Sequence, residues 1–422
     1  MPDTASNSSP TNAERDNAIL WRSALKYAGV AYLFSRLAIM VGAAIVAAEL
    51  RAEALRLGFS RLGVTPLLKP PHHGAFQGWL ARGLAGPMQD WLERHEPLRR
   101  SVATILEGAA SVVMLATDHA TLPDTASCPP GQGRVARYAW SDDYHDLLRS
   151  RVNALSAWLE ARVPGCRTRG VVDSAPIAER DFAQAAGLGW IGRNAMLISP
   201  TAGSWFLLTA FVTDVPLPAD APLETDHCGT CTACLDACPT DAFPEPGVLD
   251  AARCISALTV ESRSPIPAEL RAAMGEWVFG CDVCQEVCPW NRHAPGSSEP
   301  AMQPRDGAAT LPLAELLALD EAGFRRRFRG SAVRRAKRTG LLRSAATALG
   351  NRPDPGSFPA LAAAARDDDP VIREAATWAL GRWIGAGVMV DECRAVLGGQ
   401  VSSHDETSST SAAGSRPGPS TA

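Results

Sequence analysis

Eight of the eleven cysteines in this 422-residue chain lie between Cys228 and Cys288. Such dense clustering is not random, and disulfide scaffolds belong to short secreted chains, so the cysteines indicate metal ligation. The chain has 41 Lys and Arg against 45 Asp and Glu, a formal net charge of −4, and 46% hydrophobic residues. These values exclude a polycation and a globally disordered chain, and the length allows two to four domains.

The spacing of the cysteines is typical of a bacterial ferredoxin. The first run is Cys228-x2-Cys231-x2-Cys234-x3-Cys238-Pro239, and the second has a distant first member, Cys254, followed by Cys281-x2-Cys284-x3-Cys288-Pro289. Because the fourth cysteine of such a run ligates the other cluster, we expect two 4Fe-4S clusters. One would take Cys228, Cys231, Cys234 and Cys288, and the other Cys238, Cys254, Cys281 and Cys284.

Two zinc sites would need the same eight thiolates and are the main alternative. A CxxCxxCxxxCP run brings the third cysteine close to the first two, which suits a cubane face better than a tetrahedral ion. Two clusters can pass single electrons, so an acceptor is expected elsewhere in the chain. The scattered Cys128, Cys166 and Cys393 are predicted to be ordinary thiols.

Helix and strand patterns alternate before the cysteine region. Apolar spacing predicts helices at 50–58, around 79–92 and at 144–163, and strands at 59–64, 111–115, 167–176 and 204–213. We therefore expect a multidomain α/β and α+β protein. An α/β domain would cover 50–220 and a ferredoxin-like domain 221–300.

Two similar Ala-rich elements, 341–355 and 371–383, are typical of HEAT repeats within a helical region at 301–395. Because two units are too few for an independent solenoid, they should pack on the preceding domain. Residues 396–422 are predicted to be a disordered tail.

Residues 1–49 form an N-terminal extension of uncertain role, whose apolar run at 29–48 contains Arg36. An Arg costs roughly 2.5–3.5 kcal/mol at a bilayer centre, which favours a buried or dispensable helix over a membrane span. We expect no stable membrane association, and a cytoplasmic location.

Several short motifs, taken together, identify a family. Those motifs are Val172-Asp173-Ser174-Ala175-Pro176 with Glu179-Arg180, GLGWIGRN from Gly187 to Asn194, Ala202-Gly203-Ser204-Trp205, Cys254-Ile255-Ser256, Gly280-Cys281-Asp282 and Cys288-Pro289-Trp290-Asn291. With them the chain, from about residue 50 to 385, resembles the epoxyqueuosine reductases, the cobalamin and iron–sulfur enzymes of tRNA queuosine synthesis.

This resemblance implies a two-electron deoxygenation of the epoxide of epoxyqueuosine at the tRNA wobble position. A base-off cobalamin would be the reactive cofactor, and the clusters would deliver electrons from an unidentified donor. Asp173 matches the proposed proton donor of the family, a role that requires a raised pKa; its spacing alone would predict a turn-capping Asp. The resemblance assigns cobalamin contacts to Trp190, Ile191, Arg193, Asn194 and Ser204, with Arg99 as a further candidate.

Two features bear on the cofactor. Gly187-x-Gly189-x-x-Gly192 also fits a dinucleotide site, but it follows a helical stretch rather than a buried strand. No D-x-H-x-x-G motif is present, which agrees with a cobalamin that has no protein histidine ligand. The chain departs from the usual family pattern at Ala139–Asp142, where a Gly-Arg pair normally precedes the Asp-Tyr-His triplet found here at 143–145.

A run of nine basic residues without an acidic one extends from Arg325 to Arg343. Such a run favours a phosphate partner, although it also fits a solvated helix face. With the resemblance, we expect tRNA contacts at Arg325, Arg326, Arg327, Arg329, Arg334, Arg335, Lys337 and Arg338, while the wobble base enters the cobalamin pocket.

Two other functions fit parts of the pattern. A reductive dehalogenase shares the pairing of a corrin with two cubanes but acts on small organohalides. A ferredoxin-like carrier fused to an interaction domain would leave the α/β domain without a purpose. A monomer suits a bulky tRNA substrate.

Overall fold

The computed structural model describes residues 41–119, 128–173, 175–297 and 299–398. All but the first three residues of the predicted disordered tail at 396–422, and most of the apolar run at 29–48, lie outside these ranges. No helix in the described residues is long and apolar enough to cross a membrane.

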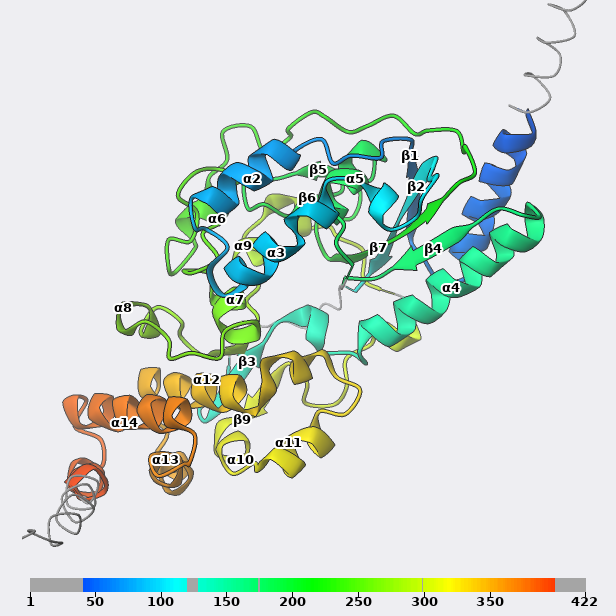
Figure 1. Ribbon diagram of the computed structural model, residues 1–422. Helices are drawn as coiled ribbons and strands as arrows, with labels where there is room; N and C mark the ends of the chain where they lie inside the picture. Colours follow the sequence, from blue (N-terminus) through cyan, green and yellow to red (C-terminus); the bar gives the residue numbers. More distant parts are fainter. Residues whose placement is uncertain (1–40, 120–127, 174, 298, 399–422) are drawn as a thin grey trace, which may run out of the picture.

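A four-stranded sheet forms the centre of the first domain (Figure 1). Its strand order is β1 (Arg61–Thr65), β2 (Ser111–Asp118), β7 (Phe206–Thr213) and β4 (Thr168–Val171), and every neighbouring pair is antiparallel. Because a dinucleotide-binding βαβ unit needs parallel strands, this topology argues against the nicotinamide alternative.

Helices cover both faces of this sheet. On one face α4 (Tyr144–Arg162) packs through Leu148 and Leu155 against Phe211. On the other, α5 (Glu179–Ala185) packs through Phe182 against Met114. Coverage on both faces explains why β2 and β7 are almost continuously apolar rather than alternating.

A helix crosses the predicted domain start at residue 50. Residues 41–56 are helical, and both Ala47 and Leu50 are buried in the same core as α4. The extension therefore joins the first domain within the described residues.

The helical region predicted around 79–92 is two helices, α2 (His73–Ala81) and α3 (Gln89–Arg99), separated by η1 (Gly86–Met88). The break occurs where Gly86, at φ +52°, lies so close to the backbone of Ala251 and Ala252 that a Cβ would clash.

Residues 221–300, which we call the cysteine segment, consist of short elements between the first sheet and the C-terminal helices (Figure 1). They are α6 (Ala233–Asp236), α7 (Ile255–Val260), α8 (Ala268–Arg271), β8 (Trp277–Phe279), α9 (Val283–Glu286) and η4 (Pro289–Asn291). Helices α6 and α9, one from each cysteine run, pack against each other.

A second sheet joins the three predicted domains. Strand β3 (Gln132–Val135) pairs in parallel with β8 and antiparallel with β9 (Thr310–Pro312). Because its strands come from all three predicted domains, boundaries at 220 and 300 do not separate independent units.

The remaining short elements are η2 (Val102–Thr104), η3 (Arg137–Ala139), the β5 (Trp190–Ile191) and β6 (Leu197–Ile198) hairpin, and η5 (Pro300–Met302).

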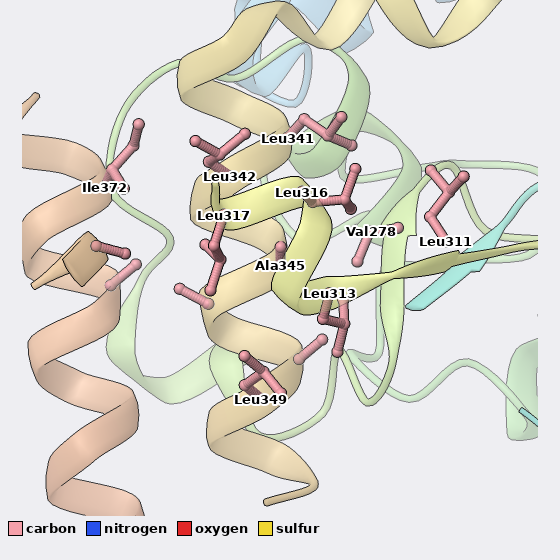
Figure 2. Close-up of a cluster of buried hydrophobic side chains, with 14 of the residues drawn as sticks. Val278, Leu311, Leu313, Leu316, Leu317, Leu341, Leu342, Ala345, Leu349 and Ile372 are labelled. Atoms are coloured by element: carbon pink, nitrogen blue, oxygen red, sulfur yellow. The ribbon is translucent and has the colours of Figure 1, made fainter. Parts of the chain in front are cut away.

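The C-terminal helices form the largest hydrophobic core. They are α10 (Leu313–Leu317), α11 (Glu321–Arg327), η6 (Ala332–Ala336), α12 (Lys337–Asn351), η7 (Pro355–Ser357), α13 (Phe358–Ala364) and α14 (Pro370–Gly385). Figure 2 shows the leucines of α10 facing Leu341, Ala345 and Leu349 of α12, with Val278 of β8 beside them. This core joins the helices to the cysteine segment, as expected for a short repeat array. A last helix covers 390–398 with Val396 buried, so the predicted tail boundary at 396 falls inside a helix.

Candidate functional site

A cavity of about 740 Å³ lies between α2, α3, the start of α5 and the residues that follow β5. Its wall combines aromatic and charged side chains, which suits a large ligand with polar substituents. Residues of the cysteine segment close one side. The lining includes His72, Phe76, Trp79, Arg99, Asp173, Glu179, Arg180, Ile191, Ala195 and Gly247 to Leu249.

Asp173 lies on this cavity just after β4. Its carboxylate accepts hydrogen bonds from His145 Nε2 at 2.9 Å and from the Tyr144 hydroxyl at 3.3 Å. His145 Nδ1 is 2.7 Å from Asp143, which caps the N-terminus of α4. The sequence thus identified Asp173 but not the Asp143–His145–Asp173 chain of contacts, whose signal was the Asp-Tyr-His triplet.

The proton affinities of these groups differ from expectation. The hydrogen bond from His145 lowers the pKa of Asp173, so this carboxyl does not meet the condition of a raised pKa for a proton donor. Burial alone would lower the pKa of His145, but its hydrogen bonds with Asp143 and Asp173 outweigh burial and raise it to about 9. The imidazole ring, rather than Asp173, therefore holds the proton at neutral pH.

A second carboxyl holds a proton more tightly than usual. Glu179 Oε1 accepts the backbone N–H of Asp173 at 3.2 Å. Burial, followed by the charge of Asp173, raises the pKa of Glu179 to about 7. Glu179 lines the cavity together with Asp173, the carboxylate that His145 contacts.

Two of the six predicted cobalamin contacts, Ile191 and Arg99, line the cavity. Arg99 donates to the Ile177 carbonyl at 3.0 Å, and its Nε is buried without a partner in the described residues. An unpaired donor on a cavity wall fits a ligand that bears acceptors, such as the amide groups around a corrin.

The other four contact the cysteine segment. Arg193 donates to the Gly229 carbonyl at 2.5 Å, and Asn194 donates to the Cys284 carbonyl at 3.3 Å. Ser204 Oγ accepts from Asn291 and Gln285 at 2.9 and 3.0 Å. Trp190 packs against Cys288 and Cys228. Their assignment to a corrin stays a prediction.

Charge interactions link the cysteines within each of the two predicted sets, and their assignment as cluster ligands stays a prediction. Burial, then the charges of Cys228, Cys288 and Cys231, raises the pKa of Cys234. In the other group, burial and then Cys254 and Cys238 raise the pKa of Cys281. The thiols of Cys254 and Cys288 already accept backbone N–H groups, as cluster thiolates do. No described residues form a site for a single metal ion, but these two groups fit four-iron clusters.

The predicted tRNA-binding residues fall into two sets. Arg325, Arg327, Arg335 and Arg338 form ion pairs with Glu321, Glu315, Glu261 and Asp367. In contrast, four exposed cations form no ion pair with the described residues, and we call them the basic surface: Arg326, Arg329, Arg334 and Lys337. Arg343 is fully buried and does not belong to a phosphate-binding stripe.

Eight cysteines in ferredoxin spacing, within a segment that closes one side of a ligand-sized cavity, are typical of an iron–sulfur oxidoreductase. Residues 227–291 match the 4Fe-4S double cluster binding domain, residues 99–174 match a family described as epoxyqueuosine reductase QueG, DUF1730, and residues 330–397 match HEAT repeats.

Whole-chain relatives agree. The epoxyqueuosine reductase of Xanthomonas campestris is 41% identical over 80% of this chain and 96% of its own length. The Pseudomonas aeruginosa enzyme is 42% identical over 77% and 91%. This chain belongs to the epoxyqueuosine reductase family.

Solved structures are also similar. An epoxyqueuosine reductase crystallised with an epoxyqueuosine-modified tRNA-Tyr stem loop has 32% identity and a TM-score of 0.74, covering 79% of this chain and 89% of that one. The Bacillus subtilis enzyme with its catalytic loop swung out of the active site has 31% identity and a TM-score of 0.74, covering 80% and 90%. The family assignment favours the reductase over the dehalogenase and the electron carrier, and the double-cluster match favours cubanes over zinc.

Proposed function

We propose that this protein reduces epoxyqueuosine at the wobble position of tRNA to queuosine. The reaction consumes two electrons and two protons, opens both C–O bonds of the epoxide and releases the oxygen as water. One observation supports it most: Asp173, held by His145 and Tyr144, lies on a large cavity that the double-cluster segment closes. Family membership supplies the substrate.

The cavity is the proposed cobalamin site. Arg99 would hold the cofactor through its unpaired Nε, and Ile191 would form part of the wall. When bound, cobalamin supplies a strongly nucleophilic and reducing cobalt that the protein itself cannot provide. The proposed cluster ligands are the two cysteine groups, which would receive single electrons from an external donor of unknown identity in the cytoplasm.

The protein residues supply the protons. His145 is protonated at neutral pH and is hydrogen-bonded to Asp173, so a proton can reach the departing oxygen through that carboxylate. Asp143 keeps the imidazole oriented and stabilises its positive charge. Glu179, whose pKa lies near neutrality, is positioned to give the second proton.

The tRNA side of the site would be the basic surface. Its four cations are exposed and are not neutralised by described carboxylates, so they can release counterions from phosphates. The neighbouring Arg335 pairs with Glu261, and its positive charge contributes to the lowered pKa of Asp173. The first described segments of the HEAT-like region would thus hold the anticodon stem near Asp173.

A reconstitution tests this function. The full chain, loaded anaerobically with iron, sulfide and cobalamin, is incubated with a reductant and either epoxyqueuosine tRNA or tRNA with queuosine already in place. Mass spectrometry of the nucleosides should detect the loss of one oxygen from the first substrate alone. An unchanged nucleoside in a fully loaded enzyme would refute the assignment.

A further inference from the structure

Trp190 packs beside two cysteines of the predicted first cluster, the one assigned to Cys228, Cys231, Cys234 and Cys288. It belongs to β5, is 1% exposed, and packs with Ile198, Cys288 and Cys228. The rings of Trp290 and His227 each meet it edge to face at a centroid distance of 4.9 Å. His227 directly precedes Cys228, and Trp290 follows Cys288-Pro289, so both cysteine runs contribute to this aromatic enclosure.

The indole Nε1 of Trp190 is buried and has no hydrogen-bond partner in the described residues. Other indoles of the chain differ in this respect. Nε1 of Trp140 donates to the Val135 carbonyl and Nε1 of Trp383 to the Leu349 carbonyl, both at 2.7 Å. Because buried N–H groups are almost always paired, the lone donor of Trp190 indicates an acceptor outside the polypeptide.

The surroundings of Trp190 identify that acceptor. Cys228 and Cys288 belong to different runs but to the same predicted cluster, and both contact the side-chain environment of Trp190. Trp190 does not line the 740 Å³ cavity, whereas the next residue, Ile191, does. The indole therefore packs on the cysteine side, where an iron–sulfur cluster would present sulfur acceptors.

We propose that Trp190 donates its indole N–H to a sulfur of the cluster held by Cys228, Cys231, Cys234 and Cys288, and thereby raises the reduction potential of that cluster. One electron from an external reductant takes the cluster from the 2+ to the 1+ state, and no proton is transferred. The added negative charge spreads over the sulfurs, so an N–H donor stabilises the reduced state more than the oxidised state. Trp190 would thus set the potential of this first cluster.

The inference rests on the proposed ligand assignment but not on the tRNA substrate. Its test uses the full chain reconstituted with iron and sulfide, without cobalamin or tRNA, and measures both cluster potentials by EPR-monitored redox titration. Trp190→Phe removes the donor. Site-specific replacement of Trp190 by benzothienylalanine, which has sulfur in place of N–H, removes the donor while keeping the shape of the ring system.

We expect both replacements to make reduction of the first cluster about tenfold less favourable, which is about 59 mV for a one-electron couple. The second cluster is the internal control and should keep its potential. Trp290→Phe is the matched variant, because it alters the same aromatic enclosure without removing an unpaired buried N–H. This variant should leave the reduction potential of the first cluster nearly unchanged.

Three results would overturn the proposal. One is an unchanged reduction potential of the first cluster in the benzothienylalanine variant. Another is an equal shift in the potentials of both clusters, which would indicate a general loss of packing. The third is loss of the first cluster in that isosteric variant, which would assign the N–H to cluster assembly instead. A missing deoxygenation activity would affect none of these measurements, so failure of the proposed function stays distinguishable.

Discussion

At the scale of single residues, the contacts of Asp173 determine the proposed chemistry. The motif around Asp173 could be found in the sequence, but its pKa could not, because its partner His145 lies 28 positions earlier and meets it only in the folded chain. An isolated carboxyl in a pocket would hold its proton more tightly, whereas a carboxylate beside a cationic imidazole releases it. The pair therefore divides storage and delivery of one proton between two residues.

We expect His145→Gln to slow deoxygenation by about 100-fold or more, because it removes the group that stores the proton. Asp173→Asn should slow it at least as much, since delivery is lost. Single-turnover rates with prereduced enzyme measure both effects, and Trp158→Phe on the far part of α4 serves as a control for folding. Rates within threefold of the unsubstituted enzyme in both variants would contradict this proton path.

The raised pKa of His145 also predicts how stability depends on pH. The contacts with Asp143 and Asp173 favour protonated His145 in the folded state, so their contribution is fully present below its usual pKa of about 6.5 and is lost as pH rises to about 9. The urea concentration at the unfolding midpoint should therefore decrease as the pH rises from about 6.5 to about 9. In His145→Gln the decline over this window should be smaller, and an identical decline would exclude His145 as its cause.

At the scale of elements, Arg343 connects the last two regions of the chain. It is fully buried in α12 and has no carboxylate partner in the described residues. Instead it donates to the carbonyls of Leu258 and Ser264, both at 2.6 Å, and to that of Ser262 at 3.2 Å. The Leu258 carbonyl belongs to α7, whose N-cap is Cys254, and the carbonyls of Ser262 and Ser264 follow that helix. One side chain of the helical repeats therefore binds the C-terminal part of α7 and the loop after it.

We expect Arg343→Met to destabilise the protein by about 3 kcal/mol, because it leaves buried carbonyl groups unpaired. Urea unfolding followed by tryptophan fluorescence measures the loss, and the exposed Arg382→Met on α14 is the control. Equal midpoints for the two variants would show that these hydrogen bonds do not stabilise the interface.

The basic surface gives a second prediction for elements. Replacing Arg326, Arg329, Arg334 and Lys337 by Gln should weaken tRNA binding and reduce the slope of log affinity against log salt by up to about 3, since each phosphate contact contributes about 0.7. Arg338→Gln is the matched control, because Arg338 pairs with Asp367 at 2.5 Å and donates to the Leu319 carbonyl. It should alter stability rather than the salt slope. Equal slopes in all three proteins would exclude the basic surface.

At the scale of the whole molecule, local patterns predicted most elements but not how they join. The helix at 144–163, the strands of the first sheet and the two repeat helices follow from apolar periodicity and are present. The sheet of β3, β8 and β9 was not predicted, because three short strands far apart in sequence have no local signal of pairing. Likewise, charge runs indicated where cations lie but not which ones Glu261 and Asp367 neutralise.

In the proposed mechanism this assembly brings electrons, protons and RNA to one cavity. The cysteine segment closes it on one side, Asp173 and Glu179 lie on its wall, and the charge of Arg335 acts on Asp173. Each part alone would fit several functions. Together with family membership, the arrangement of these parts around one cavity supports a reductive deoxygenation of a modified nucleoside.

The most direct test of this account compares the number of electrons consumed with the number of oxygen atoms lost from the nucleoside. The loaded enzyme is titrated with a calibrated reductant in the presence of excess epoxyqueuosine stem loop, and the nucleosides are quantified by mass spectrometry. We predict one queuosine formed for every two electrons consumed after the clusters and cobalamin are reduced. Consumption of electrons while the epoxide oxygen is retained would contradict the account.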